Sequence, residues 1–224
     1  MATGLAEFTK NALLIFGALF PIVNPFGNVP IFLSCTEDFT SDMRTVLARK
    51  VALNGLALLV ASILVGTNIL AFFGISLPVV RVGGGMVVIA TAWGLLNRKD
   101  EMDGPHESKR SASAADLSSR AFYPLTLPLT VGPGTISVAI TLGANRPQAN
   151  APYWSYLAAA ILGAALVAVT IYLSYRFAQS LARVLGATAM NVIIRLSSFI
   201  LLCIGVQIGW NGLSALLHSV LAGS

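Results

Sequence analysis

Two stretches decide the fold: LFPIVNPFGNVP at residues 19–30 and FYPLTLPLTVGPGT at residues 122–135. Each lies in an uncharged apolar segment, and each contains two prolines four residues apart, followed by a break rich in glycine, proline and small polar residues. Proline removes a backbone donor and interrupts a helix. Inside a membrane, such a break persists only where protein or water covers the freed backbone groups. Matching breaks in two half-chains indicate a transporter substrate site.

Composition makes the chain an integral membrane protein. Of its 224 residues, 56% are hydrophobic and only 10% are charged, whereas soluble proteins carry about 25% charged residues. The apolar runs are continuous, which favours helices over the alternating strands of a membrane barrel. The net charge of +5 comes from basic residues in short loops, so it predicts no nucleic-acid partner. We interpret Cys35 and Cys203 as small apolar residues.

The charge-free intervals predict six transmembrane helices. We expect them at about 12–35, 50–66, 69–96, 122–143, 153–177 and 192–221, with a turn near Gly66–Asn68 between the second and the third. A polar loop at 97–121 separates a first repeat, 1–96, from a second, 122–224. A three-helix unit enters the membrane from the opposite side the second time. We therefore predict a 3+3 inverted repeat with broken helices one and four.

The distribution of lysine and arginine predicts the orientation. Ten of these residues lie on one side, namely Arg44, Arg49, Lys50, Arg98, Lys99, Lys109, Arg110, Arg120, Arg176 and Arg183. Two lie on the other side, Lys10 and Arg146. Cytoplasmic loops carry the excess of basic residues. We therefore expect the central loop in the cytoplasm and both termini outside.

The residues that usually carry out catalysis are not in the predicted helices. All nine carboxylates lie outside the spans, so no buried acid is in place for a proton relay. The sequence has no Cys/His metal spacing, no nucleotide-phosphate loop and no nucleophilic triad. It therefore predicts neither an enzyme nor a cofactor.

The break residues are the candidate substrate site. They are Asn24, Pro25, Gly27 and Asn28 in the first break, and Thr130, Gly132, Gly134 and Thr135 in the second. The start of a half-helix offers free N–H groups to a carboxylate, and freed carbonyls and Asn side chains accept from an ammonium group. These groups suit a zwitterion. The alternative is that the prolines and glycines only kink the helices.

Three further polar residues lie in or near the predicted helices. Arg81 and Arg195 each open the third helix of a half. They either reach the lipid headgroups, brace freed carbonyls, or bind the substrate. Gln207 lies between Gly205 and Gly209, which allow close helix packing; its side chain either bridges helices or lines a cavity.

The motifs match a known family. FPIVNPFGNVPIFLS, FFGISLPVVRVGGGMVV, PLTLPLTVGPGTIS and RLSSFILLCIGVQIGWNGL resemble the MarC/SnatA family of six-span bacterial and archaeal inner-membrane proteins. The resemblance covers nearly the whole chain. It implies an inner-membrane protein and a transport function mapped to the break residues, because some members are described as transporters of small neutral amino acids such as glycine and alanine.

The sequence therefore predicts a transporter, most simply an exporter, of small neutral amino acids or similar polar metabolites. The alternatives are a structural or regulatory membrane protein that transports nothing, and a channel for small solutes. The expected partners are the solute and membrane lipid, and homo-oligomerisation stays open.

Overall fold

The computed structural model describes residues 2–97, 118–144 and 153–221. In chain order its elements are α1 (Ala2–Val23), α2 (Val29–Ser34), α3 (Ser41–Phe72), α4 (Leu77–Leu96), η1 (Ala121–Thr130), α6 (Pro133–Ala144), α7 (Tyr153–Arg176) and α8 (Ala178–Leu221). Five helices are long and apolar enough to cross a membrane, or six if η1 and α6, bent by 71°, form one span. The predicted all-α integral membrane fold is confirmed; the inverted repeat stays a prediction.

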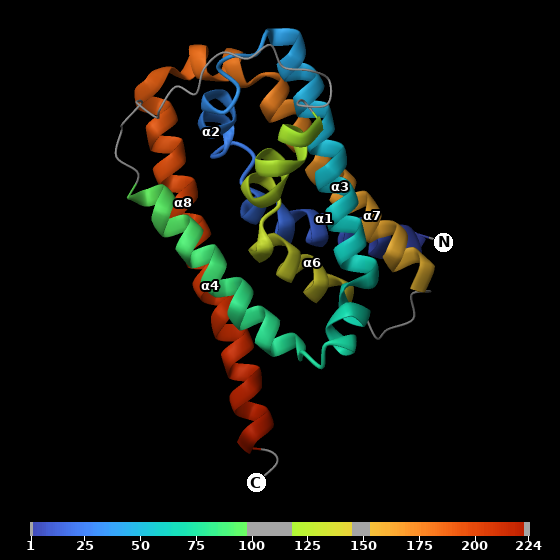
Figure 1. Ribbon diagram of the computed structural model, residues 1–224. Coiled ribbons are helices and arrows are strands. Elements are labelled where there is room, and N and C mark those ends of the chain that lie inside the picture. The colour runs from blue at the N-terminus through green and yellow to red at the C-terminus, as the bar shows by residue number, and fades with distance from the viewer. Residues whose placement is uncertain (1, 98–117, 145–152, 222–224) are drawn as a thin grey trace.

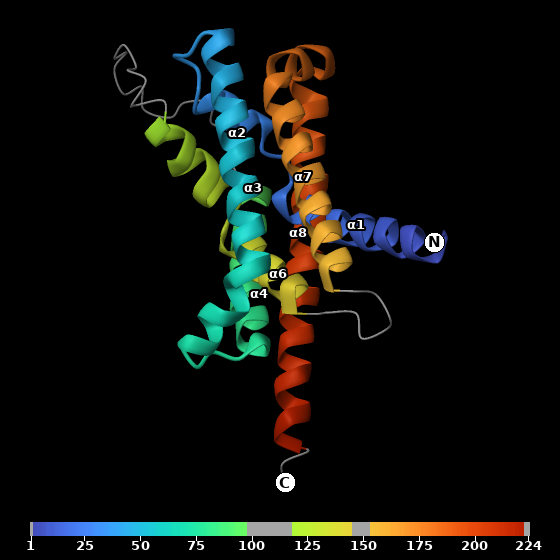
Figure 2. The same cartoon turned by 90° about the vertical axis from the view of Figure 1, so that its right-hand side faces the viewer.

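The broken segments lie at the centre of the molecule. Figure 1 shows η1 and α6 between α3 on one side and the pair of α4 and α8 on the other. Figure 2 shows α1 running across the direction of α3, α7 and α8, so that its end comes close to the centre. The first predicted span, 12–35, is therefore not one straight helix: α1 begins ten residues earlier and ends at Val23, before a break and the short α2.

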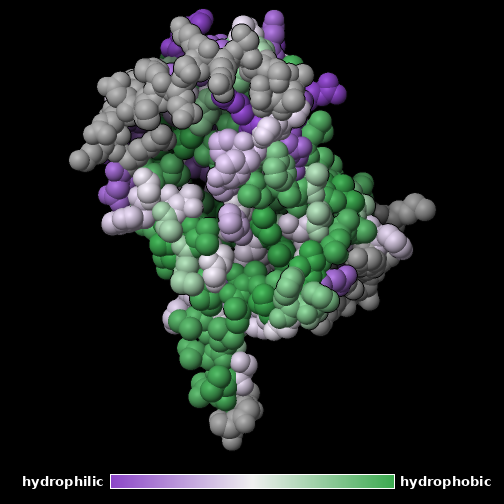
Figure 3. Space-filling view, in the orientation of Figure 1, coloured by the Kyte–Doolittle hydropathy of each residue, from purple (hydrophilic) through white to green (hydrophobic). Residues whose placement is uncertain are grey.

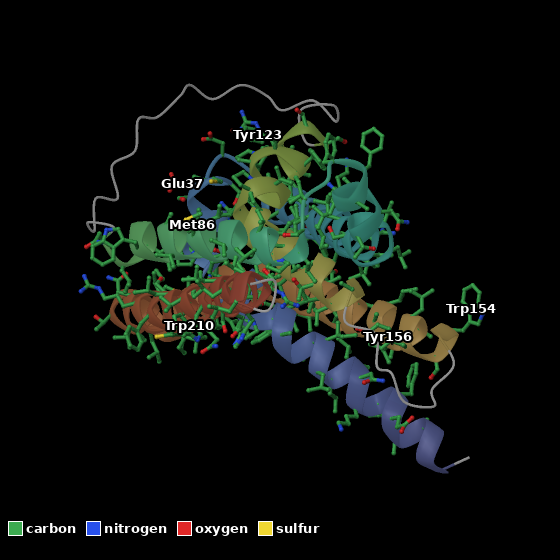
Figure 4. The ribbon with its side chains drawn as sticks, turned by 90° about the horizontal axis from the view of Figure 1, so that it is seen from below. Glu37, Met86, Tyr123, Trp154, Tyr156 and Trp210 are labelled. Atoms are coloured by element: carbon green, nitrogen blue, oxygen red, sulfur yellow. The ribbon has the colours of Figure 1, made fainter. Side chains whose placement is uncertain are left out.

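Glycines bring α4 and α8 into close contact. A Cβ atom added at Gly85 of α4 would lie 2.6 Å from the Gly209 nitrogen and 2.8 Å from the Gly205 oxygen of α8. One at Gly212 would lie 2.7 Å from the Pro78 oxygen. The two helices run side by side in Figure 4. The expected packing role is therefore confirmed for Gly205, where an added Cβ atom would lie 2.9 Å from Ile89 of α4, because small residues let membrane helices approach closely. A Cβ atom added at Gly209 meets nothing within 4 Å, so the contact does not require glycine there.

The predicted turn at Gly66–Asn68 is wrong. Gly66 is buried inside α3, which continues to Phe72, and the turn comes at residues 73–76, where Gly74 has a φ of 68°. A Cβ atom at Gly66 would collide with Ile140 of α6, and one at Gly143 of α6 would collide with the Ile63 carbonyl. Gly66 therefore makes room for a crossing helix.

The last helix is also longer than expected. The predicted span was 192–221, but α8 begins at Ala178 and is interrupted at Gly186, whose φ is 71°. Beyond this interruption, the apolar segment Thr188–Leu221 is the candidate span. The predicted linker at 97–121 falls mostly outside the described residues.

The surface fits a lipid environment. Apolar residues cover most of the face in Figure 3, and hydrophilic residues gather at the end where α3 begins. At that end Lys50 of α3 donates a 2.5 Å hydrogen bond to Ser118, just before η1. At the start of α7, Trp154 points outward (Figure 4) and is exposed.

Candidate functional site

The first break is a tight turn between α1 and α2. Asn24 has a φ of 48°, which is the left-handed conformation that Asn tolerates better than most residues. Its Oδ1 accepts a 3.1 Å hydrogen bond from the Gly27 N–H. A Cβ atom at position 27 would collide with the Asn24 side chain. The turn therefore requires glycine at position 27, and both residues are buried, as is Pro25.

Asn28 connects the first break to the second. Its Nδ2 donates to the Val23 carbonyl at 2.9 Å and to the Leu129 carbonyl at 3.2 Å. The first bond closes the turn at the end of α1, and the second crosses to a residue 101 positions away. A carboxamide has two N–H donors, so Asn28 uses both of them to hold the backbone.

The second break contains a short tandem repeat, Pro-Leu-Thr at 124–126 and again at 128–130. The residues before the two prolines, Tyr123 and Leu127, have extended backbone angles inside η1. Each threonine hydroxyl donates to the carbonyl five residues earlier, Thr126 to Ala121 and Thr130 to Leu125, both at 2.6 Å. The threonines thus satisfy carbonyls that a regular helix would pair with N–H groups.

Tyr175 of α7 contacts both breaks, and the sequence did not predict it. Its hydroxyl is 2.8 Å from Thr130 Oγ1 in the second break and also contacts the side chain of Asn28 in the first. Its ring stacks on Phe32 of α2 at 4.3 Å between centroids and 10° between planes. The signal that could have found it is Ser174–Tyr175, a polar pair that comes after the apolar run 157–169 of the helix.

The second break ends at the start of α6. The Ile136 N–H donates to the Gly132 carbonyl at 3.1 Å and begins the helical bonding. A Cβ atom at Gly134 would collide with Val88 of α4 and lie 3.3 Å from the Gly84 carbonyl. One turn further on, the Ser137 hydroxyl donates to the Val80 carbonyl at 2.8 Å. Gly134 therefore lets α6 pack closely on α4.

The Asn28–Leu129 hydrogen bond joins the two breaks at a buried junction. Asn24, Asn28, Thr130 and Thr135 are all buried. Among the described residues, three buried polar atoms have no hydrogen-bond partner, and one of them is Asn24 Nδ2. An unpaired buried donor is rare in native structures and needs an explanation. It is the one unsatisfied amide at the junction within the described part of the chain.

Arg81 lies on α4, and Arg195 and Gln207 lie on α8, outside the two broken segments. Arg195 is exposed on α8. Arg81 is half-buried on α4, and its Cβ would lie 2.9 Å from a Cβ added at Gly212 of α8. Gln207 is exposed and donates to Asn211 of its own helix at 2.9 Å. It therefore neither bridges two helices nor faces the breaks.

Comparisons with known proteins agree on one family. A sequence profile described as "MarC family integral membrane protein" matches residues 9–217. The membrane protein YvbG of Bacillus subtilis is 35% identical over 90% of this chain and 93% of its own length. The inner membrane protein MarC of Escherichia coli O1:K1 is 31% identical over 87% and 90%. MJ1677 of Methanocaldococcus jannaschii is 30% identical over 90% and 95%. No solved structure is significantly similar.

Proposed function

The chain belongs to the MarC family of integral membrane proteins, and we propose that it exports small neutral amino acids or similar small polar metabolites. The observation that supports this function most directly is the Asn28–Leu129 hydrogen bond, which joins the two broken segments. Non-helical backbone within a membrane protein is typical of substrate sites in secondary transporters. The solute would bind where the two breaks meet.

The burial of the junction supports an occluded form of the transporter. Thr130 is 1% exposed and Thr135 is 3% exposed, so a solute reaches them only after the helices move apart. Alternating access in transporters of this type comes from one repeat rocking against the other. The packing of α4 on α8 and of α3 on α7 is consistent with two equivalent halves related by an inverted repeat.

We further propose the inner membrane of a bacterium or archaeon as the location, with lipid around the apolar faces. Relatives are named as inner membrane proteins. The basic residues Arg44, Arg49 and Lys50 lie at the start of α3, the hydrophilic end in Figure 3, and α8 ends at the opposite end of the molecule (Figure 1). With the basic end in the cytoplasm, the C-terminus lies outside. By the same rule we propose that the N-terminus also lies outside. Self-association of the chain stays open.

Flux measurements in proteoliposomes test the function. Labelled glycine or alanine is loaded inside, and exit is followed with and without unlabelled amino acid outside. A transporter that alternates between two states exchanges solute faster when both sides hold it, whereas a channel does not. Protein-free liposomes are the blank. Flux no higher than this blank for both amino acids would contradict the proposal, and saturable flux without acceleration by exchange would favour a channel.

A further inference from the structure

Asn24 combines two unusual features. It is the non-glycine residue with a positive φ, 48°, in the described chain, and it is 8% exposed with an Nδ2 that has no hydrogen-bond partner. Backbone strain and unpaired polar groups persist where function requires them. Both features occur at one residue of the first break.

The direction of the free donor is fixed. Because the Gly27 N–H donates to Oδ1 at 3.1 Å, the opposite edge of the carboxamide carries the unpaired N–H groups. The other two unpaired buried atoms are the hydroxyls of Thr141 and Ser174, which lie on helices α6 and α7 and can rotate about the Cβ–Oγ bond. Asn24 therefore differs from them, since its donor cannot turn away without breaking the turn.

Asn28, four residues later, already donates both of its side-chain N–H groups. Both of its N–H groups hold backbone carbonyls, those of Val23 and Leu129. A solute could take these donors only by separating the two breaks. The two asparagines that the sequence placed together in a binding site thus have different roles.

The surroundings of Asn24 favour an oxygen anion. Ile22, just before the turn, belongs to the same apolar cluster as Val88, and Val88 also lies against Gly134 at the start of α6. The N–H groups of Gly134 and Thr135 lie ahead of the first bond of that helix, at its positive end. None of the nine carboxylates of the chain lies in either break, 19–30 or 122–135. The unpaired donor of Asn24 therefore has no carboxylate within the breaks to accept from it.

We infer that Asn24 Nδ2 is the donor that recognises the carboxylate of the solute, while Asn28 holds the two breaks together. This inference rests on the proposed function and assigns its substrate class: a small molecule with a free carboxylate.

The test replaces the donor and leaves the shape intact. Asn24→Asp keeps an oxygen for the Gly27 N–H and tolerates the positive φ, but it replaces the free donor with a carboxylate oxygen. Asn24→Gly also tolerates the φ and removes the side chain without adding charge. Asn191→Asp, at an exposed position on α8, adds the same charge elsewhere. Each variant is purified, checked for folding by thermal unfolding in detergent, and assayed for labelled alanine flux in proteoliposomes.

Competition by related probes identifies the group that Asn24 recognises. Alaninamide lacks the carboxylate charge and ethylamine lacks the group altogether. With the wild-type protein we expect alanine to compete at least about tenfold better than either probe, the difference that one hydrogen bond to a charged group makes. With Asn24→Asp and Asn24→Gly the apparent affinity for alanine falls by roughly tenfold or more, that for ethylamine does not fall, and Asn191→Asp behaves as wild type.

Two results separate the inference from the function on which it rests. If wild-type protein moves alanine and Asn24→Asp, correctly folded, moves it with the same apparent affinity, Asn24 is not the carboxylate donor and the transport function stands. The same conclusion follows if alaninamide competes as well as alanine. If the folded wild-type protein neither moves alanine nor is stabilised by it against thermal unfolding, both the function and the inference are wrong.

Discussion

The carboxamide of Asn28 donates a 3.2 Å hydrogen bond to the carbonyl of Leu129, which lies 101 residues further along the chain. Leu129 follows one of the prolines of η1, and Asn28 precedes the first residue of α2. The bond therefore joins two segments that each lack regular helical bonding. It makes the two breaks one structural unit, whose stability depends on a few polar contacts that can be removed one at a time.

Replacing Asn28 should destabilise this unit. Asn28→Leu keeps the approximate size of the side chain but removes the bonds to Val23 and Leu129. Single hydrogen bonds in membrane proteins contribute about 0.6 kcal/mol on average and up to about 1.7, so we expect a loss of about 1–2 kcal/mol. Denaturant unfolding in detergent measures it. A variant as stable as wild type would show that the bond between the breaks adds nothing.

Tyr175→Phe tests the link between α7 and the second break. The substitution removes the hydroxyl that lies 2.8 Å from Thr130 Oγ1 and keeps the ring that stacks on Phe32. We expect a loss near 0.6 kcal/mol, because packing is preserved. A double-mutant cycle with Thr130→Val isolates the pair. Additive effects of the two substitutions would mean that the two hydroxyls are not coupled.

Two nearby glycines of α4, Gly83 and Gly85, provide a matched pair of substitution sites. Gly85→Ala places a methyl group 2.6 Å from the Gly209 nitrogen of α8, whereas a Cβ atom at Gly83 meets nothing within 4 Å. Overpacking usually costs about 1–3 kcal/mol, so Gly85→Ala should lower the unfolding temperature and Gly83→Ala should not. Equal effects of the two would contradict the close packing of α4 on α8.

The sequence predicted much of this architecture and missed what depends on contacts between distant segments. Prolines and glycines located both breaks, because their effect on the backbone is local. Gly66 was misread as a turn because a glycine that admits Ile140 of α6 looks, in sequence, like one that ends a helix. The length of α3 was also underestimated. Its 32 residues extend about 48 Å, which exceeds a hydrocarbon core of about 30 Å. The helix is longer than the core because its basic first turns lie at the hydrophilic end of the molecule.

Within the site, the sequence could not separate Asn24 from Asn28. Both are asparagines beside a glycine or proline, and only the partners of their side chains distinguish them. Tyr175 was missed for a related reason, since its role comes from Thr130 and Phe32, which are 45 and 143 positions away along the chain. Thr130 was predicted as a site residue, but the bonds of Thr126 and Thr130 to the carbonyls of Ala121 and Leu125 depend on a backbone path that the sequence did not predict.

The orientation is testable with single cysteines. In a background where Cys35 and Cys203 are replaced by Ala, Ser41→Cys marks the start of α3 and Ser219→Cys marks the end of α8. Both positions are exposed, and the start of α3 and the end of α8 lie at opposite ends of the molecule in Figure 1. An impermeant thiol reagent applied to intact cells should label position 219 and leave 41 unlabelled until the membrane is opened. The reverse pattern would invert the proposed topology.

The two arginines should respond differently to lysine. Arg195 is exposed on α8, whereas Arg81 is half-buried where α4 meets Gly212 of α8. An exposed side chain that only reaches the headgroups needs a long stem and a charge, and lysine supplies both. A half-buried guanidinium depends on its planar set of five donors, which lysine lacks. We therefore expect Arg195→Lys to change stability by less than about 0.5 kcal/mol and Arg81→Lys to lose about 1 kcal/mol or more.

Unfolding in detergent gives both values, and alanine flux in proteoliposomes shows whether either charge takes part in transport. Because both arginines lie on α4 and α8 and not in the broken segments, we expect flux per folded molecule to be unchanged in both variants. A flux that falls while the fold is intact would return that arginine to the substrate site, and two variants of equal, full stability would mean that Arg81 only reaches the headgroups as well.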